Sequence, residues 1–295
     1  MKRTDIDFPS GGVSCRGWLY DPDRGRPSPC IVMAHGLGGV KELRLDAYAE
    51  RFAAAGYAVL VFDYRHFGSS DGEPRRVIDV RRQHADWRAA IAFARSLATV
   101  DAARVVLWGS SLSGGHVLRL ASEDPSLAAA ISQVPHVSAW AAMRAGRSGA
   151  TGRLMRLALL DRLGAMLGRP PRYVAAAGEP GDVALMTAPE AQEYRDLVPP
   201  GFAFNPTIAA RSVLSLMLYS PGRRAHRIQV PVLMQVALRD QTTPPEPAVA
   251  AAARIPRCEL RTYPMGHFTP YLGDAFEQFV ADQLAFLRRH VPPQT

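Results

Sequence analysis

Short runs of apolar, often β-branched residues recur along the chain, and stretches with helical periodicity separate them. This alternation is typical of a parallel sheet whose strands are joined by crossover helices. The predicted strands are residues 30–34, 58–63, 104–108, 128–134, 231–237 and 258–263. The predicted helices are residues 43–55, 78–97, 112–122 and 275–289. The first twenty or so residues predict an antiparallel strand or hairpin that leads into this sheet.

One long interval breaks the alternation. Between residues 138 and 228 the strand-like runs stop, and helical segments at 153–167 and 207–218 are separated by turns rich in proline and glycine. An insertion of about 90 residues is too long for an ordinary connection within a sheet. We therefore predict a helical cap over residues 138–228, inserted into a core formed by residues 1–137 and 229–295.

The segment V-V-L-W-G-S-S-L-S-G-G-H-V-L, which begins at residue 105, is a buried strand followed by small residues and a helix. This context is that of a nucleophile elbow, where a strained turn exposes the nucleophile and its close neighbours must be small. Ser111 has Gly109 two places before it and Ser113 two places after it. Ser110 would have a tryptophan two places before it, and Ser113 lies too far into the helix. Ser111 is the predicted nucleophile, in a G-x-S-x-S motif that departs mildly from G-x-S-x-G.

A serine hydroxyl needs a positioned histidine as its base, and the histidine needs a carboxylate to orient it. His267 follows the last predicted strand and precedes the closing helix, and Asp240 follows the strand at 231–237. Their order after Ser111 is the one expected of α/β-hydrolases. Two alternatives are less favourable, because His226 stands among arginines and is expected at the surface, whereas Asp274 is expected to be the N-cap of the final helix.

Two backbone N–H groups are expected to form an oxyanion hole. Leu112, the residue after the nucleophile, provides one of them. The other is expected from Leu37, in the glycine-rich loop of residues 35–39 that follows the first parallel strand. His35 precedes the glycine turn, and we expect a structural hydrogen-bonding role for it rather than a catalytic one.

These motifs, together with the loop D-Y-R-H-F-G-S-S-D-G that begins at residue 63, resemble the α/β-hydrolase superfamily over the whole chain except the cap. The resemblance implies an α/β-hydrolase fold, with a mostly parallel central sheet flanked by helices and an inserted helical cap. It also implies that Asp63, Arg65 and Ser70 are chiefly structural. A serine nucleophile argues against the haloalkane dehalogenase, epoxide hydrolase and dienelactone hydrolase branches. Similar caps occur in esterases, carbon–carbon bond hydrolases and S33-type aminopeptidases, within an S33/S15-related branch.

The resemblance implies a serine hydrolase that cleaves an ester or thioester through an acyl-enzyme, with no cofactor and no metal ion. An apolar acyl group is expected because the cap is rich in leucine and methionine, namely Leu154, Met155, Leu157, Leu159, Leu160, Met166, Leu214, Leu216, Met217 and Leu218. A peptidase is the alternative, and it would need acidic residues near the pocket to bind the amino terminus of its substrate. The candidates for this role are the cap carboxylates, namely Glu179, Asp182, Glu190, Glu193 and Asp196. A carbon–carbon bond hydrolase, an acyltransferase, a cofactor-free haloperoxidase-like enzyme and a catalytically silent receptor also remain open.

The composition, with 47% apolar and 21% charged residues among 295, is that of an ordinary globular protein, which excludes disordered and fibrous classes. The three cysteines lack metal or redox spacing, and no signal peptide or membrane span is apparent, so a cytoplasmic protein without membrane partners is expected. The sequence leaves homo-oligomer formation open.

The net charge of +8 comes from 33 arginines and 2 lysines against 27 acidic residues. The predicted cap alone holds 12 arginines and 6 acidic residues, a balance of +6, so steering of an anionic small-molecule substrate is one hypothesis. Nucleic acid is not an expected partner, because no segment pairs clustered charge with stacking aromatic residues. Along residues 73–88, where Arg75, Arg76, Arg81, Arg82 and Arg88 alternate with Glu73, Asp79 and Asp86, the charges predict a solvated helix face.

Overall fold

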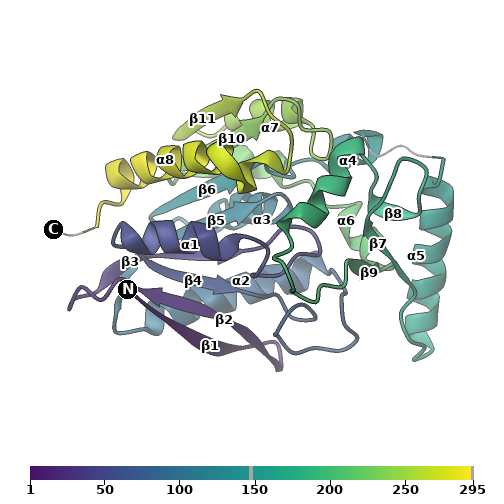
Figure 1. Cartoon of the computed structure of the whole chain (residues 1–295), viewed down its shortest axis with the longest axis horizontal. Coiled ribbons are helices and arrows are strands. Elements are labelled where there is room, and N and C mark those ends of the chain that lie inside the picture. Colours follow the sequence, from purple (N-terminus) through teal and green to yellow (C-terminus); the bar gives the residue numbers. More distant parts are fainter. Residues whose placement is uncertain (146–148, 294–295) are drawn as a thin grey trace.

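An eight-stranded sheet forms the centre of the molecule (Figure 1), in a computed structural model that describes residues 1–145 and 149–293. The strand order is β1-β2-β4-β3-β5-β6-β10-β11. The six strands from β4 to β11 in this order run parallel to one another, whereas the β1–β2 hairpin adds to β4 in antiparallel orientation. The strands are β1 (Lys2–Ser10), β2 (Val13–Asp21), β3 (Ser28–Ala34), β4 (Ala58–Phe62), β5 (Val100–Ser110), β6 (Ala129–Gln133), β10 (Val232–Ala237) and β11 (Cys258–Tyr263).

Helices cover both faces of the sheet (Figure 1). Helices α1 (Leu45–Ala54) and α8 (Gly273–His290) pack together on one face, and α2 (Val80–Ser96) and α3 (Leu112–Ala121) lie on the other. Helix α7 (Pro245–Ala252) connects β10 to β11. Because helices enclose the sheet, every residue of β3, β4, β6 and β10 is buried, which explains their continuous apolar runs.

The α/β-hydrolase fold predicted from the sequence is confirmed, and each predicted core strand and helix is present with its ends shifted by a few residues. One local prediction is wrong. Helix α8 begins at Gly273 with Leu272 as its N-cap, so Asp274 lies in the first turn instead of capping the helix. In the first turn its carboxylate still faces the positive end of the helix dipole.

The insertion between β6 and β10 is not purely helical, which corrects the prediction for residues 138–228. It contains the helices α4 (Ala139–Ala145), α5 (Thr151–Met166) and α6 (Ser212–Leu216), and the 3₁₀ helices η1 (Pro189–Leu197) and η2 (Pro221–Arg227). It also contains a three-stranded sheet in the order β8-β7-β9, formed by Ala184–Met186, Tyr173–Ala177 and Thr207–Ala209. These strands are short and rich in alanine, so they lack the β-branched runs that identify the core strands. Residues 146–148 of the predicted cap and 294–295 of the predicted core lie outside the described residues.

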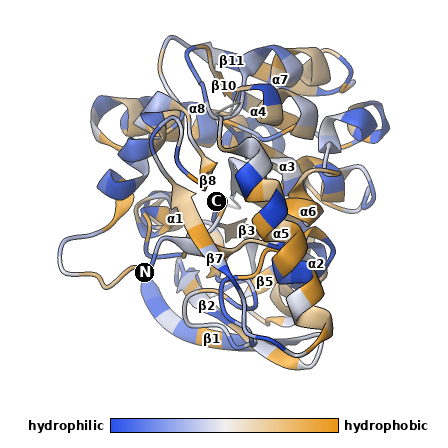
Figure 2. Cartoon of the chain, turned by 90° about the vertical axis from the view of Figure 1, so that its right-hand side faces the viewer, coloured by the Kyte–Doolittle hydropathy of each residue, from blue (hydrophilic) through white to orange (hydrophobic). Residues whose placement is uncertain are grey.

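Helix α5 forms the outer wall of the insertion, with hydrophobic and hydrophilic residues mixed along it in Figure 2. A buried carboxylate, Asp161, accepts both guanidinium hydrogen bonds of Arg211 at 2.8 and 2.9 Å and the backbone N–H groups of Arg172 and Arg211. These hydrogen bonds connect α5 to the residue before β7 and to the segment after β9. Along the part of the chain that the structure describes, no helix has the length and apolar character that crossing a membrane requires.

The charged segment at residues 73–88 is only partly a solvated face, because Asp86 is fully buried. Its carboxylate lies 2.6 Å from the guanidinium of Arg65 and accepts a hydrogen bond from the hydroxyl of Ser10 at 2.7 Å. The ion pair connects β1, the loop after β4 and helix α2. Periodicity alone did not reveal it, because the partners of Asp86 lie 21 and 76 positions away.

Candidate active site

Ser111 occupies the sharp turn between β5 and α3, with φ 57° and ψ −119°. A positive φ is strained for a residue with a side chain, and such strain is typical of a nucleophile elbow. A side chain at Gly109 would collide with the carbonyl oxygen of Ser113, so the small residue two places before Ser111 is required. The Ser111 N–H donates to the carbonyl of Gln133 at 2.9 Å, which fixes the turn against β6.

The three residues predicted to act together meet at the carboxyl ends of the parallel strands. The Oγ atom of Ser111 lies 3.0 Å from Nε2 of His267, and Nδ1 of the same imidazole lies 2.6 Å from Oδ2 of Asp240. All three side chains are buried. With the proton of His267 on Nδ1, Nε2 is free to accept the hydroxyl proton of Ser111. Ser110, in contrast, accepts a hydrogen bond from Tyr271 at 2.6 Å on the other side of the strand end.

The carboxylate of Asp240 is held by the turn that follows it. Oδ1 accepts the backbone N–H groups of Thr242 and Thr243 at 2.9 and 2.6 Å, and the Thr243 hydroxyl donates to Oδ2 at 2.8 Å. Burial lowers the pKa of His267, but the charge and hydrogen bond of Asp240, with the charges of Glu190 and Glu193, raise it above its ordinary value of 6.5. The site therefore favours the imidazolium that forms when the serine proton is taken.

The two predicted oxyanion donors belong to two segments next to Ser111, the loop at residues 35–39 and the start of helix α3. Within residues 1–145 and 149–293, the backbone N–H groups of Leu37 and Leu112 have no hydrogen-bond partner, and both residues line a cavity that Ser111 also lines. A Cβ atom at Gly36 would lie 3.1 Å from Cβ of Ser111, so glycine allows the loop to approach the serine this closely. The arrangement leaves two donors available for a substrate oxyanion.

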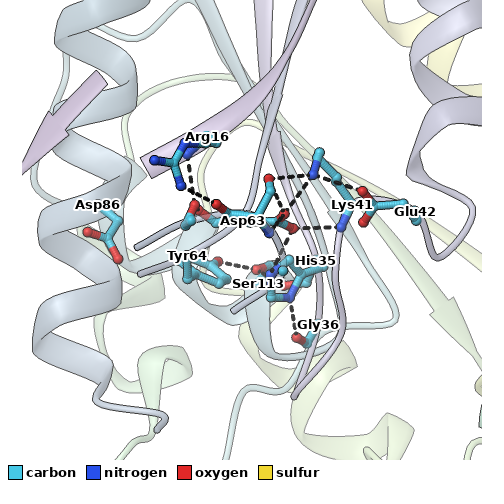
Figure 3. A network of polar contacts seen from close by, with 12 residues as sticks. Arg16, His35, Gly36, Lys41, Glu42, Asp63, Tyr64, Asp86 and Ser113 are labelled. Carbon is cyan, nitrogen blue, oxygen red and sulfur yellow. Dashed lines mark hydrogen bonds and ion pairs between the residues drawn. The ribbon is translucent and has the colours of Figure 1, made fainter. Parts of the chain in front are cut away.

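Ser113, the residue that departs from the usual glycine, has a structural role. Its hydroxyl donates to the carbonyl of His35 at 2.5 Å and contacts the hydroxyl of Tyr64 (Figure 3). It therefore ties helix α3 to the first residue of the loop at 35–39. His35 is buried, and its Nε2 atom has no hydrogen-bond partner among the described residues. Burial lowers the pKa of its imidazole, so the ring is neutral near pH 7, which is consistent with the structural role expected of it.

Asp63 holds the other end of the same loop. Its carboxylate accepts the backbone N–H and the ammonium group of Lys41, each at 2.8 Å (Figure 3). Lys41 also pairs with Glu42 at 2.8 Å and donates to the hydroxyl of Ser69 at the same distance. A side chain at Gly68 would collide with the Asp63 carboxylate. Asp63 thus anchors the residues that follow the loop at 35–39, which carries the predicted donor Leu37.

Two residues near the site have positions that the sequence did not predict, namely His136 and Glu190, the latter expected only as one of several cap carboxylates for a peptidase. His136, just after β6, is half-buried, donates its backbone N–H to the carbonyl of Ser111 at 2.9 Å and lines the same cavity. Its position three residues after β6 is the only signal in the sequence that could have indicated it. Glu190, from the insertion, contacts the segments that carry Asp240 and His267. His226 is exposed beside Arg254, and its expected surface position is confirmed.

Ser111 lies where two cavities meet. The larger has a volume of about 170 Å³ and extends into the insertion, and the smaller, of about 30 Å³, lies beside His267. No lysine or arginine lines either cavity among the described residues, and the larger one has a single charged residue, Asp182. Four of the ten apolar cap residues expected at a substrate line it, namely Leu154, Met155, Leu216 and Met217. Within the described ranges, no cluster of three or more histidines, cysteines or carboxylates is placed to hold a metal ion.

Comparisons with known proteins identify the family of this chain. The model of the family described as serine aminopeptidase, S33, matches residues 25–267. The quorum-quenching protein AidA of Acinetobacter baumannii is 47% identical over 98% of this chain and 95% of its own length, and a polyketide transferase of Aspergillus fumigatus is 30% identical over 99% of both chains. The crystal structure of the α/β hydrolase GrgF from Penicillium superposes with a TM-score of 0.85, at 26% identity over 98% of this chain and 99% of that one. This chain is therefore an enzyme of the α/β-hydrolase superfamily and belongs to its S33 serine aminopeptidase family.

Proposed function

We propose that the protein is a serine hydrolase that cleaves a carboxylic ester or thioester through an acyl-enzyme. The observation that supports this most is the continuous chain of contacts from Ser111 through His267 to Asp240, on a strained elbow beside two unpartnered backbone N–H groups. Each part has a separate task in acyl transfer, and all parts face one point.

In this mechanism the Oγ atom of Ser111 attacks the acyl carbon while Nε2 of His267 takes the hydroxyl proton. Asp240 accepts the Nδ1–H of His267, which keeps the imidazole oriented and stabilises its positive charge. The N–H groups of Leu37 and Leu112 hold the oxyanion of the tetrahedral intermediate. His267 then gives the proton to the leaving group, and a water molecule, activated by the same imidazole, releases the acid.

The two cavities suggest how a substrate lies. The leaving group must be close to His267, because this residue protonates it, so we assign the smaller cavity to the leaving group and the larger, apolar cavity to the acyl chain. An apolar lining favours a neutral acyl chain. The described arginines of the insertion lie outside both linings, so we propose that they act on an anionic substrate by long-range steering.

Replacing the nucleophile tests the proposal. Ser111→Ala should lower kcat for a short p-nitrophenyl ester by about 10³-fold or more, because the acyl-enzyme can no longer form, and it should abolish labelling by a fluorophosphonate probe. The melting temperature of the variant should stay close to that of the wild type. Ser110→Ala is the matched control, because this neighbouring hydroxyl points to Tyr271 and should be dispensable for turnover. Retention of labelling in Ser111→Ala would contradict the assignment.

Acyl transfer is a second candidate, and the identity to a polyketide transferase over nearly the whole chain favours it. A transferase uses the same acyl-enzyme but resolves it with an alcohol or thiol in place of water. The same ester assay distinguishes the two reactions when it is repeated with rising concentrations of an alcohol acceptor. A hydrolase keeps producing free acid, whereas a transferase shifts its product to the new ester.

A further inference from the structure

Glu190 lies on η1 of the insertion, far from the predicted triad in sequence, yet its side chain reaches the two loops that carry Asp240 and His267. Oε1 accepts the backbone N–H groups of Gln241 and Thr242 at 2.6 and 2.8 Å, and the hydroxyl of Thr242 at 3.0 Å. Oε2 accepts the backbone N–H of His267 at 3.1 Å. The single carboxylate of Glu190 thus connects the two residues that follow Asp240 to the backbone of His267.

The loop that carries His267 is shaped to receive this carboxylate. A Cβ atom at Gly266 would lie 2.7 Å from Oε2 of Glu190, so any side chain there would displace one partner. The glycine immediately before the base is therefore explained by Glu190. Glu190 itself lines neither of the two cavities described above. Its contacts therefore indicate a role in holding the loops rather than in binding a substrate.

The charge of Glu190 reaches the imidazole as well. Three carboxylates act on His267 from the elements around it, namely Asp240 after β10 and Glu190 and Glu193 on η1. His136 after β6 also lies within reach of this ring, and the charge of His267 lowers the pKa of His136. Burial lowers the pKa of His267, and the three carboxylates raise it. Glu193 is exposed and shares only this electrostatic effect, since its side chain has no hydrogen bond to the loops within the described residues.

We propose that Glu190 is a positioning residue through which the insertion holds the loops of Asp240 and His267 in the relative positions that catalysis requires. The proposal rests on the proposed function. It predicts that hydrolysis depends on a residue of the insertion that contacts neither the substrate nor the reacting atoms. A loss of this support would move Asp240 and His267 relative to Ser111, and a displacement of about 1 Å in a catalytic group can cost about 10²-fold in rate.

Three variants separate this role from a general effect of charge. Glu190→Ala removes every contact, Glu190→Gln keeps one acceptor oxygen and so can hold one loop at a time, and Glu193→Gln removes a nearby charge without touching a loop. We expect kcat for a p-nitrophenyl ester to fall about 10²-fold in Glu190→Ala and about tenfold in Glu190→Gln, with KM changed less than threefold. Glu193→Gln should stay within twofold of the wild type.

A titration of the imidazole gives a readout that does not need turnover. The pKa of His267, followed by NMR of its ring carbons, should fall further in Glu190→Gln than in Glu193→Gln, because the charge of Glu190 raises it more. The rising limb of kcat/KM should move to lower pH with it. If the wild type neither hydrolyses esters nor labels with a fluorophosphonate, the proposed function fails, while the titration still tests Glu190. A His267 pKa and a kcat in Glu190→Gln that match those of Glu193→Gln would overturn the positioning role, as would a fall in melting temperature with full activity.

Discussion

Lys41 is one of two lysines in a chain with 33 arginines, and its ammonium group lies where three acceptors converge. These are the carboxylates of Asp63 and Glu42 and the hydroxyl of Ser69. A compact ammonium with three rotatable donors fits such a buried corner, whereas the planar fork of a guanidinium needs more room. This exception to the arginine bias therefore lies directly after the loop at 35–39, which carries the predicted oxyanion donor Leu37.

Lys41→Met should destabilise the protein by about 3–5 kcal/mol, because it leaves the buried Asp63 carboxylate without its partner. The free energy of unfolding in urea measures this. The other lysine supplies the control: Lys2 is exposed on β1, and Lys2→Met should change the stability by less than about 0.5 kcal/mol. Equal effects of the two substitutions would show that the buried pair contributes nothing.

The residues that could be predicted from the sequence are those whose chemistry is tied to a local pattern. Ser111 stands in a strand–turn–helix motif, and Asp240 and His267 each follow a recognisable strand. Glu190 and His136 have no such pattern. The contacts of Glu190 join segments 51 to 77 positions apart, and the contact of His136 depends on the path of the chain after β6. A carboxylate that accepts backbone N–H groups is not distinguishable in sequence from one that faces water.

Helix α5 shows, at the scale of one element, an unusual division between its faces. Its inner side contributes Leu154 and Met155 to the larger cavity, and Asp161 binds Arg211 beneath it. Its outer side exposes a stripe of large apolar residues, namely Leu159, Leu160, Leu163 and Met166. The helix is therefore attached by a few inner contacts, and its outer apolar residues contribute little to the stability of the monomer.

The two sides of α5 should respond differently to substitution. Asp161→Ala removes four hydrogen bonds and takes the carboxylate away from the Arg211 guanidinium, so we expect a loss of about 2–4 kcal/mol in the free energy of unfolding. Leu163→Ala on the outer side should cost less than about 0.5 kcal/mol. Urea unfolding of both variants, with kcat/KM as a second readout, tests this. A large cost at Leu163 would mean that the stripe is covered in solution.

The strands of the core and those of the insertion illustrate what sequence patterns can predict for whole elements. Core strands such as β3 and β4 are buried on both faces, and their continuous apolar runs identify them. In the insertion, β7 reads Y-V-A-A-A and β9 reads T-I-A, which suit a helix as well as a strand. Their strand conformation comes from pairing with each other, which is a tertiary effect that overrides local propensity.

At the scale of the whole molecule, a buried histidine cluster joins the core to the insertion. His84 on α2 lies 3.0 Å from His116 on α3, and the hydroxyl of Tyr219, between α6 and η2, lies 2.8 Å from the same ring. His136 stacks on Tyr219. Burial lowers the pKa of His84 and of His136 to about 4 and lowers that of His116 well below its ordinary value, so all three rings are neutral in the folded protein near pH 7.

These histidines should make the fold sensitive to mild acid. In the unfolded chain they bind protons near pH 6.5, but in the folded protein only near pH 4 or below, so stability is full above pH 6.5 and falls as the pH drops toward 4. Each should remove about 1–2 kcal/mol by pH 5, where ordinary carboxylates are still ionised. His267, with its raised pKa, acts in the opposite direction.

Urea unfolding between pH 5 and 7.5 measures the slope. His84→Asn should reduce it, because one of the neutral buried rings no longer titrates in the unfolded chain. The exposed His226→Asn is the control and should leave the slope unchanged. A stability that does not vary with pH in this window would contradict the burial of these rings as neutral groups.

The burial of Lys41 also affects how the enzyme can be handled. A reagent that couples to primary amines reaches Lys2 but not Lys41, because the latter is enclosed by its ion pairs. Lys2 begins β1, the outermost strand of the sheet, and the insertion projects from the opposite end of the molecule (Figure 1). Attachment to a solid support through lysine would therefore hold every molecule by the same edge and leave the substrate cavity facing the solution.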